Sequence, residues 1–188
     1  MSFASHLEKS ADLIRAVGSS ALSIECEKAA ATIVTALKGG APVLVCGNGG
    51  SACDAMHITG ELVGRFLRIR RAYNVVCISA NPAILTAWSN DYAFDTVFSR
   101  QVEAHAKRGG VLWGLSTSGN SPNVIAAFEE SKKHGMLNIG MTGAGGGRLA
   151  DLSDVLIAVP SADTPLIQQA HICIYHYICE TVESLLSY

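Results

Sequence analysis

The sequence has few charged residues and no concentrated charge of either sign. Asp, Glu, Lys and Arg make up 16% of the 188 residues, against about a quarter in a typical soluble domain. No run of Lys and Arg is longer than two residues, and the formal net charge is -2. Nucleic-acid-binding surfaces need a basic stripe, so we expect no nucleic acid partner. The sparse charge instead predicts that other copies of the chain cover part of the surface.

Long apolar runs are also missing, and we expect no signal peptide at the N-terminus. No stretch approaches the ~18 uninterrupted apolar residues that a membrane span needs. The N-terminus carries His6, Glu8 and Lys9 where a signal peptide has its apolar core. We therefore expect a cytoplasmic protein with no membrane partner.

Cysteine spacing excludes the common metal and redox motifs. The six cysteines stand singly within apolar or helical segments, and no Cys-x-x-Cys pair occurs. Isolated thiols in such surroundings usually behave as small apolar side chains, so we predict that they are buried. These residues are Cys26, Cys46, Cys53, Cys77, Cys173 and Cys179.

Apolar periodicity predicts two helices and then alternating strands and helices. The opening helices cover residues 5–17 and 23–37, and short continuous apolar runs of buried-strand type follow them. The predicted strands are residues 42–46, 75–79, 111–115, 137–141 and 155–159. Helical patterns after them cover residues 52–64, 122–133 and 164–187. This alternation predicts one α/β domain over residues 1–188, a three-layer sandwich with a five-stranded parallel sheet flanked by helices and a helical extension over about residues 1–40.

Two predicted loops have the composition of an anion site. Ligands of parallel sheets bind beyond the carboxyl ends of the strands. There, residues 47–51 read Gly-Asn-Gly-Gly-Ser and residues 116–121 read Ser-Thr-Ser-Gly-Asn-Ser, each before a helix. One serine is enough to cap a helix, whereas four hydroxyls at one helix start predict a phosphate site. Neither loop has the spacing of a dinucleotide or P-loop motif.

His57 and Glu61 are candidate proton-transfer groups. They are four residues apart in a predicted helix, so they share one face. This face points toward the first loop if Ala55, Ile58 and Leu62 face the sheet. The alternative interpretation is an exposed pair on a solvated surface.

The last predicted helix carries polar residues in an otherwise apolar sequence. They are Gln168, His171, Tyr175 and His176, and polar groups in such a stripe need partners. If a His and a Gln face the Glu and His of the other helix, the group can transfer protons or hold a metal. A carboxylate and an imidazole beside a phosphate site predict aldose-ketose isomerisation of a phosphorylated sugar through an enediol.

Four segments, in order, resemble the sugar isomerase (SIS) domain family and, within it, the phosphoheptose isomerases. They are residues 46–66, 83–104, 115–128 and 159–176, and the resemblance covers nearly the whole chain. It implies a flavodoxin-like or Rossmann-like fold and conversion of sedoheptulose 7-phosphate to D-glycero-D-manno-heptose 7-phosphate. It also implies a homotetramer with active sites at subunit interfaces and the N-terminal helices in the contacts.

The resemblance further implies roles for individual residues. Glu61 matches the family's catalytic base and His176 its acid. His57, Glu61, Gln168 and His176 match positions that bind zinc in some members, one ion per subunit. The matching substrate-binding positions are Asn48, Gly49, Gly50, Ser51, Arg65, Asn90, Asp91, Ser116, Thr117, Ser118, Ser121, Thr164 and Gln168.

Two segments depart from the family pattern. Residues 79–83 read Ser-Ala-Asn-Pro-Ala where many members have Thr-Thr-Asp-Thr-Ser, so Asn81 replaces an acidic residue that bears on sugar recognition. Residues 65–73 lack the Arg-Pro pair often found there. Two alternative functions stay open: a non-catalytic phosphosugar-binding or regulatory protein, and an isomerase of a hexose or arabinose phosphate. The presence of Glu61 and His176 favours an enzyme.

Overall fold

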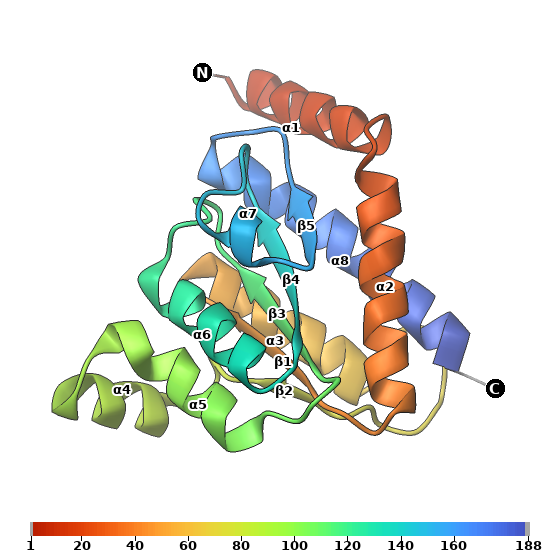
Figure 1. Cartoon of the computed structure of the whole chain (residues 1–188). Coiled ribbons are helices and arrows are strands. Elements are labelled where there is room, and N and C mark those ends of the chain that lie inside the picture. Colours follow the sequence, from red (N-terminus) through yellow and green to blue (C-terminus); the bar gives the residue numbers. More distant parts are fainter. Residues whose placement is uncertain (1, 187–188) are drawn as a thin grey trace.

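Five parallel strands form a single sheet in the computed structural model, which describes residues 2–186. The strand order is β2-β1-β3-β4-β5, the order of flavodoxin-like sheets. The strands are β1 (Val43–Gly47), β2 (Val75–Cys77), β3 (Val111–Leu115), β4 (Leu137–Thr142) and β5 (Val155–Ala158). Helices cover both faces (Figure 1), so the predicted three-layer α/β sandwich is confirmed.

The helices divide between the two faces of the sheet. Helices α2, α3 and α8 pack on one face, with α1 against their outer side, while α5, α6 and α7 pack on the other and α4 lies at its margin. Their bounds are α1 (Phe3–Gly18), α2 (Leu22–Lys38), α3 (Gly50–Val63), α4 (Pro82–Asp91), η1 (Phe94–Thr96), α5 (Val97–His105), α6 (Pro122–Lys133), α7 (Leu149–Leu152) and α8 (Thr164–Leu186). Within residues 2–186, no helix has the length and apolar content that crossing a bilayer requires.

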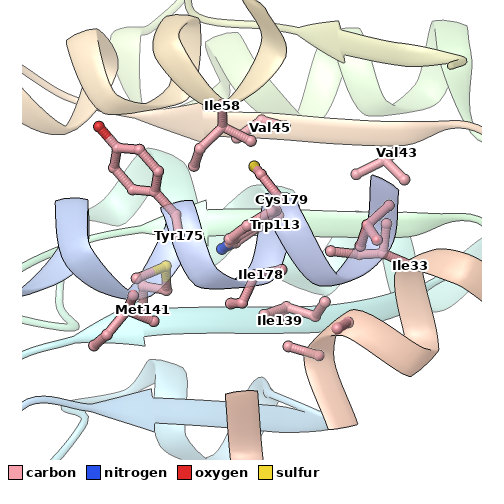
Figure 2. Packing of buried hydrophobic residues seen from close by; sticks show 14 of the residues in the cluster. Ile33, Val43, Val45, Ile58, Trp113, Ile139, Met141, Tyr175, Ile178 and Cys179 are labelled. Atoms are coloured by element: carbon pink, nitrogen blue, oxygen red, sulfur yellow. The ribbon is translucent and has the colours of Figure 1, made fainter. Parts of the chain in front are cut away.

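The core follows from the alternation of side chains along buried strands. In β1, Val43 and Val45 join the apolar cluster under α2, α3 and α8, whereas Leu44 and Cys46 join the cluster under α5 and α6. Trp113 and Tyr175 are the largest fully buried side chains, and Figure 2 shows Tyr175 near Ile58 of α3 and Trp113 near Cys179 of α8. Burying side chains of this size contributes roughly 1.5–3 kcal/mol each, which fixes α3 and α8 on the same face.

The predicted elements agree with the observed ones to within two residues at each end that the structure describes. The predicted last residue of α8, Ser187, lies outside the described residues. Helices α4 and α5 were not assigned individually from the sequence. Helix α4 has no buried residue, so its sequence carries little of the apolar stripe on which such an assignment depends.

The prediction that all six thiols are buried was wrong for two of them. Cys53 and Cys173 are exposed, while Cys77 is partly buried and the other three are buried. Cys53 precedes the buried Ala55 by two residues, about 200° around α3, and so faces away from the sheet. Cys173 shares the outer face of α8 with Tyr177, which is also exposed.

His171 is a buried histidine that supports the fold. Its Nε2 lies 3.2 Å from the carbonyl oxygen of Thr142 at the end of β4, and because a carbonyl only accepts, Nε2 carries the proton. Among the described residues, Nδ1 has no hydrogen-bond partner. Burial, opposed by this hydrogen bond, lowers the pKa of His171 from 6.5 to about 4. His171 therefore faces away from the polar group on α8 to which the sequence had assigned it.

We expect His171→Gln to remove part of the acid sensitivity of the fold. As the pH falls below 6.5, the unfolded chain takes up a proton at residue 171, whereas the folded chain does so only near 4. The stability that neutral His171 provides is thus complete above pH 6.5 and lost progressively toward pH 4, by on the order of 3 kcal/mol. Urea denaturation of both proteins between pH 7.5 and 4 should give a steeper pH dependence in the wild type; equal slopes would contradict this role.

Candidate active site

A polar cavity of about 310 Å3 lies where the loops after β1 and β3 meet the start of α8. Helices α3, α6 and α8 all begin beside it, so their partial positive ends favour an anion there. None of the lining side chains is charged. They belong to Asn48, Gly49, Gly50, Ser51, Leu115, Ser116, Thr117, Ser121, Thr164 and Gln168.

The hydroxyls of the second loop do not serve as simple helix caps. Ser121 is the N-cap residue of α6 but makes no side-chain cap bond; its Oγ lies 2.9 Å from Oγ of Ser116. Oγ1 of Thr117 lies 3.4 Å from Oγ1 of Thr164, which joins this loop to α8. Ser118 differs, since its Oγ accepts the backbone N–H of Asn120 in an exposed turn and does not line the cavity. Three of the four hydroxyl residues therefore line the cavity, where they can face a bound anion.

Buried amide groups hold the first loop in place. Asn48 donates to Oδ1 of Asn123 at 2.8 Å, and Asn123 donates back to Oδ1 of Asn48 at 2.9 Å. Ser79 bonds both the N–H and the carbonyl of Gly47. Asn123 and Ser79 are buried and Asn48 partly buried, so these hydrogen bonds restrict the loop to few arrangements. Sequence analysis did not select Asn123, because it looks like an ordinary residue in the first turn of α6.

Glycine is required where the second loop meets the segment after β4. At Gly119, φ is +66°, and an added Cβ would lie 1.9 Å from the carbonyl oxygen of Gly146. Only a residue without a side chain permits this approach. The Ser/Thr loop is thus anchored from behind by a backbone contact.

A second group of polar residues lies further along α3 and α8. Nε2 of His57 is 3.0 Å from Oε1 of Glu61 and 3.4 Å from Nε2 of His176. One ligand atom from each of the three residues lies within 4.8 Å of those of the other two. Ala55, Ile58 and Leu62 are buried, so this face turns away from the sheet, but it faces α8 rather than the first loop to which the sequence had assigned it. The pair is partly open to solvent, with 44% and 21% of the His57 and Glu61 side chains exposed, but it faces α8 rather than bulk water alone.

The other ring nitrogen of His57 belongs to a buried chain of polar groups. Its Nδ1 lies 2.8 Å from the hydroxyl of Tyr175, which donates a long 3.5 Å bond to Oδ1 of Asp54. With that hydroxyl proton directed at Asp54, its oxygen can accept the proton of Nδ1. The 3.0 Å contact between Nε2 and Oε1 of Glu61 then needs a proton on one of these two atoms or a cation between them. Burial raises the pKa of Tyr175, so the hydroxyl keeps its proton.

Asp54 is a functional candidate that the sequence analysis missed. Burial raises its pKa, opposed by the hydrogen bond from Tyr175 and the charge of His57, and its Oδ2 has no hydrogen-bond partner among the described residues. Its position three residues before His57, on the same face of α3, was the available signal. Tyr175 was noted only as a polar residue in an apolar stripe.

The chemistry of this cluster fits a divalent metal ion. Two imidazole nitrogens and a carboxylate oxygen are the ligand types of zinc, and the second nitrogen of His57 has the kind of outer partner that metal-bound histidines have. The fourth predicted ligand, Gln168, lies elsewhere: its amide packs against Gly50 and lines the anion cavity. Eight residues separate it from His176, a rise of about 12 Å along α8.

The remaining predicted residues lie outside the cavity lining. Arg65 is exposed in the loop after α3. Asn90 and Asp91 are exposed at the end of α4, where Asn90 donates to Asp91 at 2.9 Å. Asn81, the replacement for an acidic residue, caps α4 by accepting the N–H groups of Ala83 and Ile84.

Comparisons with known proteins assign the family. The sequence profile described as SIS domain matches residues 5–143. The chain belongs to the SIS domain family.

Within that family the chain belongs with the phosphoheptose isomerases. It is 55% identical over 149 residues to "Phosphoheptose isomerase" of Crocosphaera subtropica, covering 79% of this chain and 76% of the relative. The protein of the same name from a Bradyrhizobium species is 47% identical over 184 residues, covering 97% and 93%. The solved phosphoheptose isomerase GmhA from Neisseria gonorrhoeae superposes with a TM-score of 0.91 at 38% identity, covering 96% of each chain.

We expect Gly50→Ala to weaken anion binding while the fold is retained. The added Cβ would lie 2.6 Å from Nε2 of Gln168, so this flexible amide must move out of the cavity wall. Alanine in a helix is favoured over glycine by roughly 0.5–1 kcal/mol, and losing one hydrogen bond to an anion raises Kd about tenfold. Calorimetric titration with inorganic phosphate measures this change.

The matched control is Gly60→Ala in the same helix, whose Cβ meets no atom within 4 Å. We expect it to leave the Kd for phosphate unchanged. Equal affinities in the two variants would exclude Gln168 from the anion site.

Proposed function

We propose that the chain converts sedoheptulose 7-phosphate to D-glycero-D-manno-heptose 7-phosphate. It is an enzyme, an aldose-ketose isomerase, as its curated relatives are. The observation that carries the proposal is the approach of Glu61 and His176 to within 4.8 Å on two helices that begin at an anion cavity. A base and an acid so close can reach two adjacent carbons of one sugar.

The anion cavity is the proposed site for the phosphate of the sugar. Neutral hydroxyls and backbone amides bind a phosphate without the strong grip of an Arg pair, which suits a ligand that must leave after turnover. We assign the phosphate to Ser51, Ser116, Thr117, Ser118 and Ser121 and the sugar to Asn48, Gly49, Gly50, Arg65, Asn90, Asp91, Thr164 and Gln168. Four of these residues lie outside the cavity lining: Ser118, Arg65, Asn90 and Asp91. They can contact the substrate only if their loops move toward the cavity or if they belong to the site of a neighbouring subunit.

Glu61 and His176 would transfer the protons. Glu61 removes a proton from C1 of the ketose while His176 protonates the C2 oxygen, which gives an enediol. Glu61 then returns its proton to C2, and His176 takes the proton of the C1 hydroxyl as the aldehyde forms. Both residues finish in their starting protonation states, so the cycle repeats without an external acid or base.

His57, Glu61 and His176 are also the proposed ligands of one zinc ion per subunit. Gln168, the fourth ligand that the resemblance implies, lines the anion cavity instead. A zinc-bound Glu61 would be a poorer base, so the ion would either be structural or polarise the sugar oxygens in place of proton transfer by Glu61. Tyr175 and Asp54 support this proposal, because they hold His57 in the tautomer whose Nε2 is free to ligate.

We expect Glu61→Gln to abolish isomerisation while sugar-phosphate binding stays within about tenfold, because a lost base mainly raises the barrier. The wild type should convert sedoheptulose 7-phosphate, followed by NMR as aldose formation, and the variant should not. His176→Gln should behave in the same way. Retained turnover in Glu61→Gln would contradict the assignment of Glu61 as the base.

The same assay decides the substrate. Hexulose and pentulose phosphates, including the ketose that isomerises to arabinose 5-phosphate, are tested as alternative substrates. Conversion of the seven-carbon sugar alone supports the proposal, and faster conversion of another sugar phosphate identifies a different isomerase.

Zinc affinity should depend on the outer partner of His57. We expect Tyr175→Phe to weaken zinc binding by about 10- to 100-fold, the usual effect of losing such a partner. Tyr177→Phe, two residues away on the exposed face of α8, is the matched control. Chelator competition with metal analysis measures both variants, and equal affinities would contradict the tautomer role.

We also propose a homotetramer with active sites at subunit interfaces. Helix α1 has no buried residue, yet it presents Phe3 and Leu7, and the neighbouring Ile24 is 53% exposed. An apolar groove of about 390 Å3 lies between α1, α2 and α8. An apolar groove together with exposed large apolar side chains on the same helices is typical of a protein interface.

Sedimentation equilibrium should give a mass four times 19.7 kDa. Leu7→Glu should lower the mass because it buries a charge in the contact, whereas Lys132→Glu on α6 should not. A wild-type mass of one chain excludes the tetramer.

A further inference from the structure

The loop after α3 folds around a single buried carboxylate from the far end of α8. Oε1 of Glu183 accepts the backbone N–H of Phe66 at 3.0 Å, and Oε2 accepts those of Leu67 at 2.7 Å and Arg68 at 2.9 Å. Nε of Arg70 donates to Oε1 at 3.1 Å. The Glu183 side chain is only 1% exposed.

These bonds keep Glu183 ionised inside the protein. Burial alone would raise its pKa, but the N–H groups of Leu67, Phe66 and Arg68 and the charge of Arg70 outweigh burial and lower the pKa. Three successive backbone donors directed at one anion form a nest, and the loop has no regular secondary structure of its own to hold it otherwise. The carboxylate is therefore the centre about which residues 64–71 are arranged.

Arg70 connects the loop around Glu183 to the backbone of Glu61. Its Nη2 donates to the backbone carbonyl of Glu61 at 2.7 Å, and Nη1 donates to the carbonyl of Gly64 at 3.0 Å. Its guanidinium also lies over the ring of Tyr73, 4.1 Å from the centroid. The last turn of α3, which carries the proposed base, is thus tied to Glu183 through one planar group with a fixed donor geometry.

Phe66 connects the loop around Glu183 to His176. The two rings are stacked, with centroids 5.6 Å apart and planes inclined by 27°. The backbone N–H of Phe66 is itself bound to Glu183, so the carboxylate sets where this ring lies. Arg70 and Phe66 therefore lead from one carboxylate to both members of the proposed acid-base pair.

We propose that Glu183 is a positioning residue for isomerisation, setting Glu61 through Arg70 and His176 through Phe66. The role rests on the proposed function, since it requires these two residues to perform the proton transfers. Misplacing an acid and a base by a fraction of an ångström lowers the rate of the chemical step more than it lowers substrate affinity. A purely structural clamp would instead alter stability alone.

The test compares Glu183→Gln with Val102→Ala. The second variant removes core atoms from α5 on the opposite face of the sheet and serves as a control for lost stability. Trypsin reports on the loop directly, because residues 65, 68, 70 and 71 are arginines. At a temperature well below both unfolding transitions, we expect Glu183→Gln to speed cleavage after Arg65 and Arg68 and to lower kcat about tenfold, with KM changed less than threefold.

Val102→Ala should show neither effect. Rapid cleavage of Glu183→Gln with kcat equal to that of Val102→Ala would overturn the proposal in favour of a structural clamp. If Glu183→Gln does not fold, Phe66→Leu and Arg70→Lys test the proposal instead, because each breaks one of the two connections to the acid-base pair. Unchanged kcat in both variants also overturns the proposal.

A readout without turnover separates this proposal from the proposed function. The ring 15N and 1H NMR signals of His176 should shift in Glu183→Gln and in Phe66→Leu but not in Val102→Ala. If the wild type isomerises no sugar phosphate, the proposed function fails, and a His176 signal that is the same in Glu183→Gln and wild type overturns the positioning role independently.

Discussion

The packing of α3 beside α8 on one face of the sheet is the constraint on which the site depends. Ile58 and Leu62 of α3 share one buried cluster with Ile178 and Cys179 of α8. Burial of these apolar stripes fixes the rotation of both helices about their axes. His57 and His176 are 119 residues apart in sequence. They meet because each side chain lies at a fixed angle, around its helix axis, from the buried apolar face of that helix.

In the proposed function, anion binding and proton transfer take place in different parts of the site. The cavity at the carboxyl edge is lined by neutral groups and three helix starts, whereas the ionisable residues His57, Glu61 and His176 lie further along the helices. A carboxylate in the anion cavity would repel a phosphate, and a cationic side chain would bind it too tightly for release; the lining contains neither. The parallel sheet makes this possible, since all of its loops of one kind emerge at the same edge.

Buried polar side chains hold the site from behind. Asn123 fixes the first loop, Tyr175 orients His57, and Glu183 organises the loop after α3. Each is costly to bury unless its hydrogen bonds are made, so each permits few alternative arrangements of the residues that it contacts. Oδ2 of Asp54, without a hydrogen-bond partner among the described residues, is the exception, and it lies next to the cluster whose ligand types fit a metal ion.

The sequence by itself determined the order of the five strands and of the helices with clear apolar periodicity, the parallel sheet, the hydroxyl-rich loops and the shared face of His57 and Glu61. These depend on residue spacing within single elements, such as the four residues that separate His57 from Glu61, and helix and strand geometry converts that spacing directly into faces. Only the tertiary structure decided that His171 serves the core, that Cys53 and Cys173 are exposed, and that Asn123, Asp54 and Glu183 support the site. Those outcomes depend on contacts between elements distant in sequence, and a side chain on a helix does not reveal which neighbour will pack against it.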